Sequence, residues 1–313
     1  MTERIVTLRN AAGHALHCIL HEPAPGVPRA TLGCLLLSPG VKMRVAPHRL
    51  YRKLLGEFLD RGIAVPRVDF HGLGDSEGDL AEAQLDQLYR QVQLGRHVDD
   101  VRTALRFLER EFRLERFVVG GLCGGALTGL LTSEYERGIV GLYAIGIPVV
   151  LDGGGAHVSA NMTKGELSTW RGAALAKMLK PKAWLRVLTL RSDIRTILRS
   201  FFPRLGRGGR KVELARVPPP ASPVAENLNP HFPRALFGLL QKRAPALLLF
   251  SGADRLQFEY QEKFATPWSG PLHEFDSLLQ VTVIPKANHV LGDAAWVAEA
   301  RTITAAWLDR CFK

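Results

Sequence analysis

A cysteine lies between glycines at the junction of a predicted strand and a predicted helix. Residues 117–120 are strand-like, residues 121–125 read Gly-Leu-Cys-Gly-Gly, and a helical pattern follows over 126–135. This order matches the nucleophile elbow G-x-S-x-G, with cysteine in place of serine. Cys123 is therefore predicted to be the nucleophile of an acyl-transfer reaction, with the N–H of Gly124 as a donor to the oxyanion. A buried structural cysteine before a tight turn is the alternative interpretation.

Two further residues complete a triad in the chain order nucleophile, acid, histidine. Asp254 follows the apolar segment 246–250, and His289 follows the segment 281–284. Both lie just past predicted strands, where reactive groups gather in parallel sheets. His289 is predicted to deprotonate Cys123, and Asp254 to orient the imidazole. A surface-loop histidine and a turn-capping aspartate are the structural alternatives.

Two assignments around this triad remain open in the sequence. Asp152 directly follows the apolar strand 139–150 and is the alternative acid. The second oxyanion donor is expected in the loop after the first buried strand, where the position after Gly40 favours the N–H of Val41. An ordinary Pro-Gly turn would explain the same loop.

The elements around these residues alternate between strands and helices. This alternation predicts an α/β fold, a doubly wound and mostly parallel sheet with right-handed crossovers. The core is predicted to comprise residues 1–150 and 246–313. Its elements are expected to be a hairpin over 4–21, strands over 31–37, 63–70, 117–120, 139–150, 246–250 and 281–284, and helices over 49–61, 98–112, 126–135 and 294–308.

The segment 151–245 interrupts this alternation and is predicted to be a helical lid inserted over the sheet. It holds 17 Lys and Arg residues against five Asp and Glu, an excess larger than the net charge of +11 of the whole chain. Three interpretations of this charge compete: docking of an acidic carrier protein, contact with an anionic membrane surface, or a solvated lid surface. Nucleic acid is not expected as a partner, because no recognised binding motif accompanies the charge.

The composition of the chain argues against a membrane-spanning, a metal-binding and a secreted protein. The 313 residues are 46% hydrophobic, and the absence of an apolar run of 18 residues predicts no transmembrane helix. The four cysteines form no C-x-x-C pair and no Cys/His cluster has zinc-ligand spacing, so neither a metal nor a cofactor is predicted. The N-terminal residues lack the layout of a secretory signal, and a reducing, cytoplasmic location is the simplest interpretation.

Taken together, the motifs resemble the α/β-hydrolase superfamily of the serine aminopeptidase and esterase type. The resemblance covers residues 1–150 and 245–313 and rests on Ser38-Pro39-Gly40, Asp69-x-His71-Gly72-x-Gly74-x-Ser76, Gly121-x-Cys123-x-Gly125, Gly252-x-Asp254 and Asn288-His289. A narrower resemblance, to the exosortase-system-associated hydrolases that also carry cysteine at the elbow, rests on Val41, His48, Arg49, Gly121-Leu122-Cys123 and the segment 180–186. The chain departs from the wider pattern because cysteine replaces serine and no His-Gly precedes the oxyanion position.

A cysteine nucleophile restricts the acyl donor. A thioester intermediate lies higher in energy than an oxoester, so it forms easily from another thioester and uphill from a stable ester or amide. The chain is therefore predicted to hydrolyse a thioester, an activated ester or a lactone through an acyl-cysteine intermediate. An acyltransferase that passes the acyl group to an amine or alcohol is the alternative. A binding protein on a hydrolase fold is an alternative of another class, which the complete triad disfavours.

Overall fold

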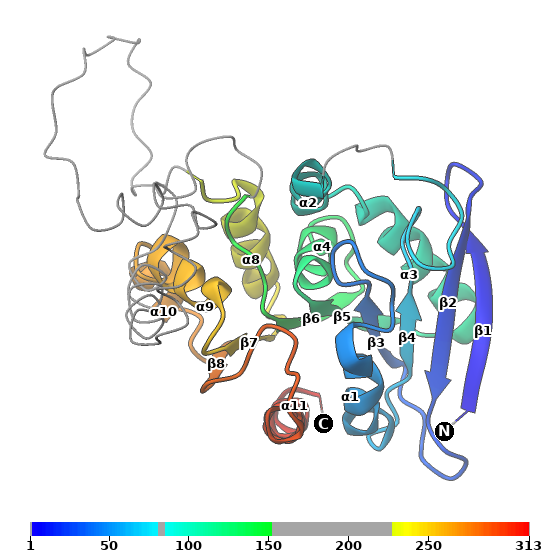
Figure 1. Cartoon of the computed structure of the whole chain (residues 1–313). Helices are drawn as coiled ribbons and strands as arrows, with labels where there is room; N and C mark the ends of the chain where they lie inside the picture. Colours follow the sequence, from blue (N-terminus) through cyan, green and yellow to red (C-terminus); the bar gives the residue numbers. More distant parts are fainter. Residues whose placement is uncertain (1, 81–84, 152–226, 313) are drawn as a thin grey trace, which may run out of the picture. The chain divides into compact units, whose positions relative to one another are not determined.

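The computed structural model describes residues 2–80, 85–151 and 227–312 of the chain. An eight-stranded sheet has the strand order β1-β2-β4-β3-β5-β6-β7-β8 (Figure 1). Only β2 runs against its neighbours β1 and β4, and all other neighbouring strands are parallel. The predicted mostly parallel α/β sheet is therefore confirmed. The strands are β1 (Thr2–Arg9), β2 (Ala15–Glu22), β3 (Leu32–Leu37), β4 (Val65–Val68), β5 (Arg116–Leu122), β6 (Ile139–Ile145), β7 (Ala246–Ser251) and β8 (Leu279–Ile284).

Helices cover both faces of the sheet, as a doubly wound fold requires. The helices α1 (Leu50–Leu59) and α11 (Ala294–Cys311) share one apolar cluster with one face. The helices α3 (Val98–Phe112), α4 (Gly124–Thr132) and α8 (His231–Gln241) share the cluster of the other face. The other helical segments are η1 (Pro47–Arg49), α2 (Leu85–Gln93), α9 (Arg255–Glu259), η2 (Tyr260–Ala265) and α10 (Ser269–His273).

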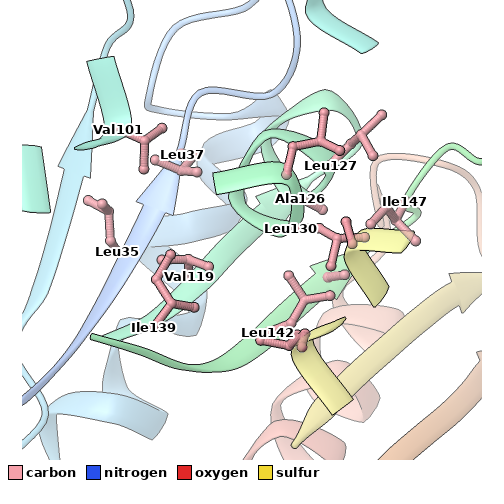
Figure 2. Close-up of a cluster of buried hydrophobic side chains, with 14 of the residues drawn as sticks. Leu35, Leu37, Val101, Val119, Ala126, Leu127, Leu130, Ile139, Leu142 and Ile147 are labelled. Carbon is pink, nitrogen blue, oxygen red and sulfur yellow. The ribbon is translucent and has the colours of Figure 1, made fainter. Parts of the chain in front are cut away.

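The central strands are buried on both faces, which explains their continuous apolar sequences. Every residue of β3 and of β7 is buried. Leu37 of β3 and Val119 of β5 pack in one cluster with Ala126, Leu127 and Leu130 of α4 (Figure 2). All nine residues of α4 are buried. A helix that is apolar on every side can be stable only inside the core, so α4 is fixed firmly against the strands beside it.

The helix α8 belongs to the core and not to the predicted insertion. Its residues Phe232, Leu236 and Leu239 are buried in the same cluster as α4. On its solvent side, Arg234 contacts the carboxylate of Glu134 at 2.6 Å. The boundary predicted at residue 245 is therefore wrong, because this segment has an apolar face with helical spacing that packs on the sheet. Residues 152–226, the remainder of the predicted lid, lie outside the described residues.

Two other elements differ from the prediction in extent. The strand expected over 139–150 ends at Ile145 as β6, where Gly146 adopts a φ of +55° and turns the chain. The helix α2 was not predicted, although its Leu85, Leu88 and Val92 have helical spacing. Among the described residues, no helix has the length and apolarity needed to cross a membrane.

Candidate active site

Cys123 occupies the sharp turn between β5 and α4. Its φ of 55° and ψ of −122° form a backbone conformation that residues other than glycine rarely adopt. The N–H of Cys123 donates to the carbonyl oxygen of Ile145 at 2.8 Å, which ties the turn to β6. The side chain is partly exposed at the N-terminal end of α4. A strained, anchored turn of this kind presents a reactive side chain to a pocket.

The glycines after Cys123 allow α4 to contact the loop that follows β3. A Cβ atom on Gly124 would lie 2.7 Å from the Cα of Gly40. A Cβ atom on Gly125 would lie 2.7 Å from the carbonyl oxygens of both Leu37 and Ser38. Real Cβ atoms do not approach backbone this closely, so a side chain at either position would push the loop away. The loop and the start of α4 therefore lie side by side because both positions are glycine.

His289 and Asp254 form a hydrogen-bonded pair between the loops after β8 and β7. The Nδ1 atom of His289 lies 2.6 Å from Oδ2 of Asp254. The exposed fractions of the two side chains are 34% and 10%. Gly146, at the end of β6, lies against the pair, since a Cβ atom there would be 3.4 Å from the imidazole. Three neighbouring strands thus contribute their carboxyl ends to one place.

The imidazole of His289 lines the same pocket as Cys123. Burial lowers the pKa of His289, but hydrogen bonds to Asp254 and Cys123, together with the charges of these partners, raise the pKa to about 10. Because Nδ1 faces Asp254, the other ring nitrogen, Nε2, is the atom available to the sulfur. Two of the three residues predicted as a triad, His289 and Asp254, are therefore hydrogen-bonded, and Cys123 lines the same pocket as both.

A pocket of about 610 Å³ lies over these three residues. Its walls are mostly apolar, with the ring of Tyr89 and the three charged side chains of Asp86, Asp254 and Arg255, and α2 contributes five of its lining residues. The lining residues are Leu85, Asp86, Tyr89, Val92, Gln93, Cys123, Gly124, Pro148, Asp254, Arg255, Leu256 and His289. Such a pocket suits a mostly apolar ligand.

The two predicted oxyanion donors lie on segments that contact each other. Gly124 begins α4 and lines the pocket, whereas Val41 is absent from the pocket lining and follows Gly40 in the neighbouring loop. Within the described parts of the chain, neither N–H donates a hydrogen bond. Asp152, the alternative acid, lies outside the described residues, and Asp254 is the carboxylate that contacts His289.

A buried ion pair supports the loop after β3. Asp69, fully buried, pairs with Arg44 and accepts a hydrogen bond of 3.0 Å from the hydroxyl of Ser38. Arg44 also contacts Asp75 at 2.6 Å. A Cβ atom on Gly74 would overlap the carboxylate of Asp69. The glycine-rich motif after β4 thus shapes the loop that carries Val41 and supplies no residue to the pocket lining.

The other cysteines lie apart from the pocket. Cys18 and Cys34 are buried in the sheet, and burial raises the pKa of Cys18 to about 12 and that of Cys34 further. Cys311 is partly exposed at the end of α11. Among the described residues, no group of His, Cys, Asp and Glu side chains has the arrangement of a metal site.

His289 is expected to titrate near pH 10 in the folded protein, since Asp254 and Cys123 stabilise its protonated form. Its folded pKa lies above the unfolded value of 6.5, so the protonated ring stabilises the fold below pH 6.5 and this contribution is lost as the pH rises toward 10. The difference in unfolding free energy between wild type and His289→Ala should therefore shrink over that range in urea titrations. NMR titration of the His289 ring should give a pKa near 10 in wild type and a lower pKa in Asp254→Asn. A wild-type pKa near 6.5 would contradict the stabilisation of the protonated ring by Asp254 and Cys123.

Comparison of the whole chain with solved structures identifies the class of fold. An esterase from Pyrococcus furiosus aligns with a TM-score of 0.56 at 15% identity, covering 100% of this chain and 92% of the esterase. An α/β serine hydrolase without lid, from Xanthomonas campestris, gives a TM-score of 0.52 at 13% identity over 99% and 95% of the two chains. The esterase domain of a Rhodothermus marinus protein gives 0.52 at 15% identity over 99% of each.

These similarities show that the chain has the α/β-hydrolase fold. No protein-family model matches the sequence, and no curated protein matches it either. The narrower resemblance to exosortase-system-associated hydrolases is therefore untested and stays a prediction.

Proposed function

We propose that this protein is an acyl hydrolase in which Cys123 is the nucleophile, His289 moves protons and Asp254 orients His289. The observation that supports this most strongly is the imidazole of His289, which lies 2.6 Å from the carboxylate of Asp254 and lines the same pocket as Cys123. The similarity in fold to esterases and a serine hydrolase agrees with the same class of reaction. At the identities involved, the similarity in fold alone does not assign the chemistry, which rests on the site.

Acylation begins with attack of the Cys123 sulfur on the carbonyl carbon of the substrate. A carbon–sulfur bond forms, the carbonyl π electrons move to oxygen, and the N–H groups of Gly124 and Val41 stabilise the oxyanion. As the carbonyl re-forms, the bond to the leaving group breaks. Protonated His289 gives its Nε2 proton to the departing thiolate or alkoxide, which leaves an acyl-cysteine and a neutral imidazole.

Deacylation reverses these roles with water as the nucleophile. Neutral His289 takes a proton from water while the oxygen attacks the acyl-cysteine carbonyl. Collapse of the second oxyanion breaks the carbon–sulfur bond, releases the carboxylic acid and returns Cys123 as a thiolate beside protonated His289. Asp254 stays hydrogen-bonded to Nδ1 of His289 in both half-reactions, so that Nε2 remains directed at the leaving group or the water molecule.

Thioesters are the favoured class of substrate, with activated esters and lactones as further members. Exchange between two thioesters is nearly neutral in energy, so Cys123 accepts an acyl group from a thioester without an uphill step. The apolar pocket walls suit a hydrocarbon acyl chain. The acidic carrier and anionic membrane interpretations concern the basic segment outside the described residues, and they stay predictions.

Incubation with a panel of acyl thioesters should add the mass of one acyl group to the protein, detected by intact-protein mass spectrometry. The adduct is expected on the peptide that contains Cys123, because this sulfur alone lies beside His289. Cys311→Ser is the matched control, since Cys311 is also partly exposed but does not line the pocket. It should acquire the same adduct as wild type.

The fate of the adduct separates hydrolysis from transfer. A hydrolase loses the adduct to water at the same rate with or without an added amine or alcohol. An acyltransferase loses it faster as the acceptor concentration rises and yields the acylated acceptor. An adduct that forms on Cys311 and not on Cys123, or release of the acid at the wild-type rate by Cys123→Ala, would exclude the acyl-cysteine mechanism.

A further inference from the structure

The phenol of Tyr51 lies directly beneath the elbow, between two strands that end at the active site. Tyr51 is on α1 and is fully buried. Its hydroxyl donates a hydrogen bond to the carbonyl oxygen of Leu37 at 2.7 Å and accepts one from the N–H of Leu122 at 2.7 Å. Burial raises the pKa of Tyr51 above its ordinary value, so the hydroxyl stays protonated as the donor.

These two bonds join the strands where their ladder ends. The paired residues of β3 and β5 run as far as Leu37 beside Gly121. Beyond this pair the strands separate, because β3 enters the loop that carries Val41 while β5 enters the elbow. An unpaired buried N–H or carbonyl group is costly, and the phenol satisfies one group on each strand.

The first glycine of the elbow is required by this phenol. Gly121 has a φ of +144°, and a Cβ atom there would lie 2.4 Å from the Tyr51 hydroxyl oxygen and 2.9 Å from the oxygen of Leu37. A side chain at this position would displace the hydroxyl or the end of β3. The glycines of the G-x-C-x-G motif therefore have two structural roles. They allow the strand-to-helix turn, and the first of them makes room for Tyr51.

We propose that the Tyr51 hydroxyl sets the spacing between the nucleophile and the oxyanion-donor loop, and is thereby a positioning residue for acyl transfer. Leu122 directly precedes Cys123, and Leu37 lies four residues before Val41. A hydroxyl bonded to both ends holds the two segments at a fixed separation. This inference rests on the proposed function, because an oxyanion forms only if Cys123 is acylated.

The test compares Tyr51→Phe with Tyr143→Phe in the full-length protein. Tyr143 is a matched control, because it is also fully buried in the same apolar cluster and its hydroxyl makes one buried hydrogen bond, of 2.8 Å, to Thr304. Both variants lose a buried hydroxyl, but only the first loses a contact with the elbow. Two reactions of Cys123 are then measured, turnover of an acyl thioester and alkylation by iodoacetamide.

Tyr51→Phe should lower kcat for the thioester about 10- to 100-fold with little change in KM, since displaced donors stabilise the oxyanion less well. Alkylation forms no oxyanion, so its rate should stay within about twofold of wild type. Tyr143→Phe should leave both rates near the wild-type values. Turnover is expressed per amount of folded protein, which is measured by circular dichroism.

Equal kcat values for Tyr51→Phe and Tyr143→Phe would overturn the inference while leaving the proposed function intact. A parallel loss of alkylation in Tyr51→Phe would also overturn it, because the hydroxyl would then act on the sulfur itself. Failure of Tyr51→Phe alone to fold would make the phenol a stability element and would equally reject the positioning role. Absence of thioester turnover in wild type would instead reject the proposed function, and this inference with it.

Discussion

Replacing Cys123 with alanine is expected to reduce thioester turnover by roughly 10⁴-fold or more, because the other residues that line the pocket include no cysteine, serine or threonine. The fold should persist. Alanine is smaller than cysteine, and the turn is held by the hydrogen bond from the N–H of residue 123 to Ile145, which the substitution keeps. Steady-state kinetics with an acyl thioester measure the loss, and circular dichroism with thermal melting measures the fold.

Cys311→Ala provides the control for general effects of removing a thiol. This residue lies at the end of α11 and lines no part of the pocket over Cys123. Its variant should keep wild-type kcat and KM. Turnover by Cys123→Ala within tenfold of wild type would remove the nucleophile from the mechanism. A binding protein on a hydrolase fold would instead be favoured if wild type bound the substrate without any turnover.

The parts of the site that depend on local chain geometry could be predicted from sequence. The elbow around Cys123 is recognisable because strand, glycines and helix are consecutive in the sequence. The glycines indicate that the backbone packs closely against its neighbours at this turn. Asp254 and His289 could be placed because parallel strands bring their carboxyl ends to one edge, so a residue just past one strand neighbours a residue just past the next. In the structure His289 and Asp254 form a hydrogen-bonded pair and Cys123 lines the same pocket, while the roles of the three residues remain the proposal tested above.

The parts that depend on distant contacts were missed. Tyr51 has the spacing of an ordinary core residue on an amphipathic helix, and nothing local indicates that its hydroxyl bonds Leu122, which is 71 residues away. Gly146 was likewise placed inside the strand predicted over 139–150, and nothing local indicates that it ends the strand and lies against the His289–Asp254 pair. Helix α2 forms a wall of the pocket, and its apolar residues have helical spacing in the sequence, but no helix was predicted there.

The extent of the insertion was misjudged for a related reason. Basic residues and prolines made the whole segment 151–245 look different from the core. The apolar face of α8, with Phe232, Leu236 and Leu239 at helical spacing, was the signal that its end belongs elsewhere. Hydrophobic spacing is a better guide to what packs on a sheet than average charge, because burial acts on one face of a helix and charge is carried by the other.

Removal of the His289 imidazole is expected to lower kcat for thioester hydrolysis by about 10⁴-fold, in line with the loss of a triad base. The protonated ring supplies the proton to the leaving group, and the neutral ring activates water, so His289→Ala impairs both half-reactions. Asp254→Asn should cost less, because the imidazole remains but loses the carboxylate that fixes its orientation and stabilises its protonated form. Single-turnover acylation and deacylation rates separate the two steps.

A second histidine–aspartate pair in the chain supplies the control. His273 lies 2.6 Å from Asp276, the same separation as in the pair of His289, but it is exposed and remote from the pocket lining. His273→Ala should therefore leave turnover unchanged. The comparison shows whether the loss in His289→Ala comes from the position of His289 in the pocket or from the loss of any histidine–carboxylate pair. A mild effect of Asp254→Asn beside a severe effect of Asp152→Asn would move the acid role to Asp152. An equal loss in His289→Ala and His273→Ala would mean that neither ring acts in the chemistry and that the pairs serve only stability.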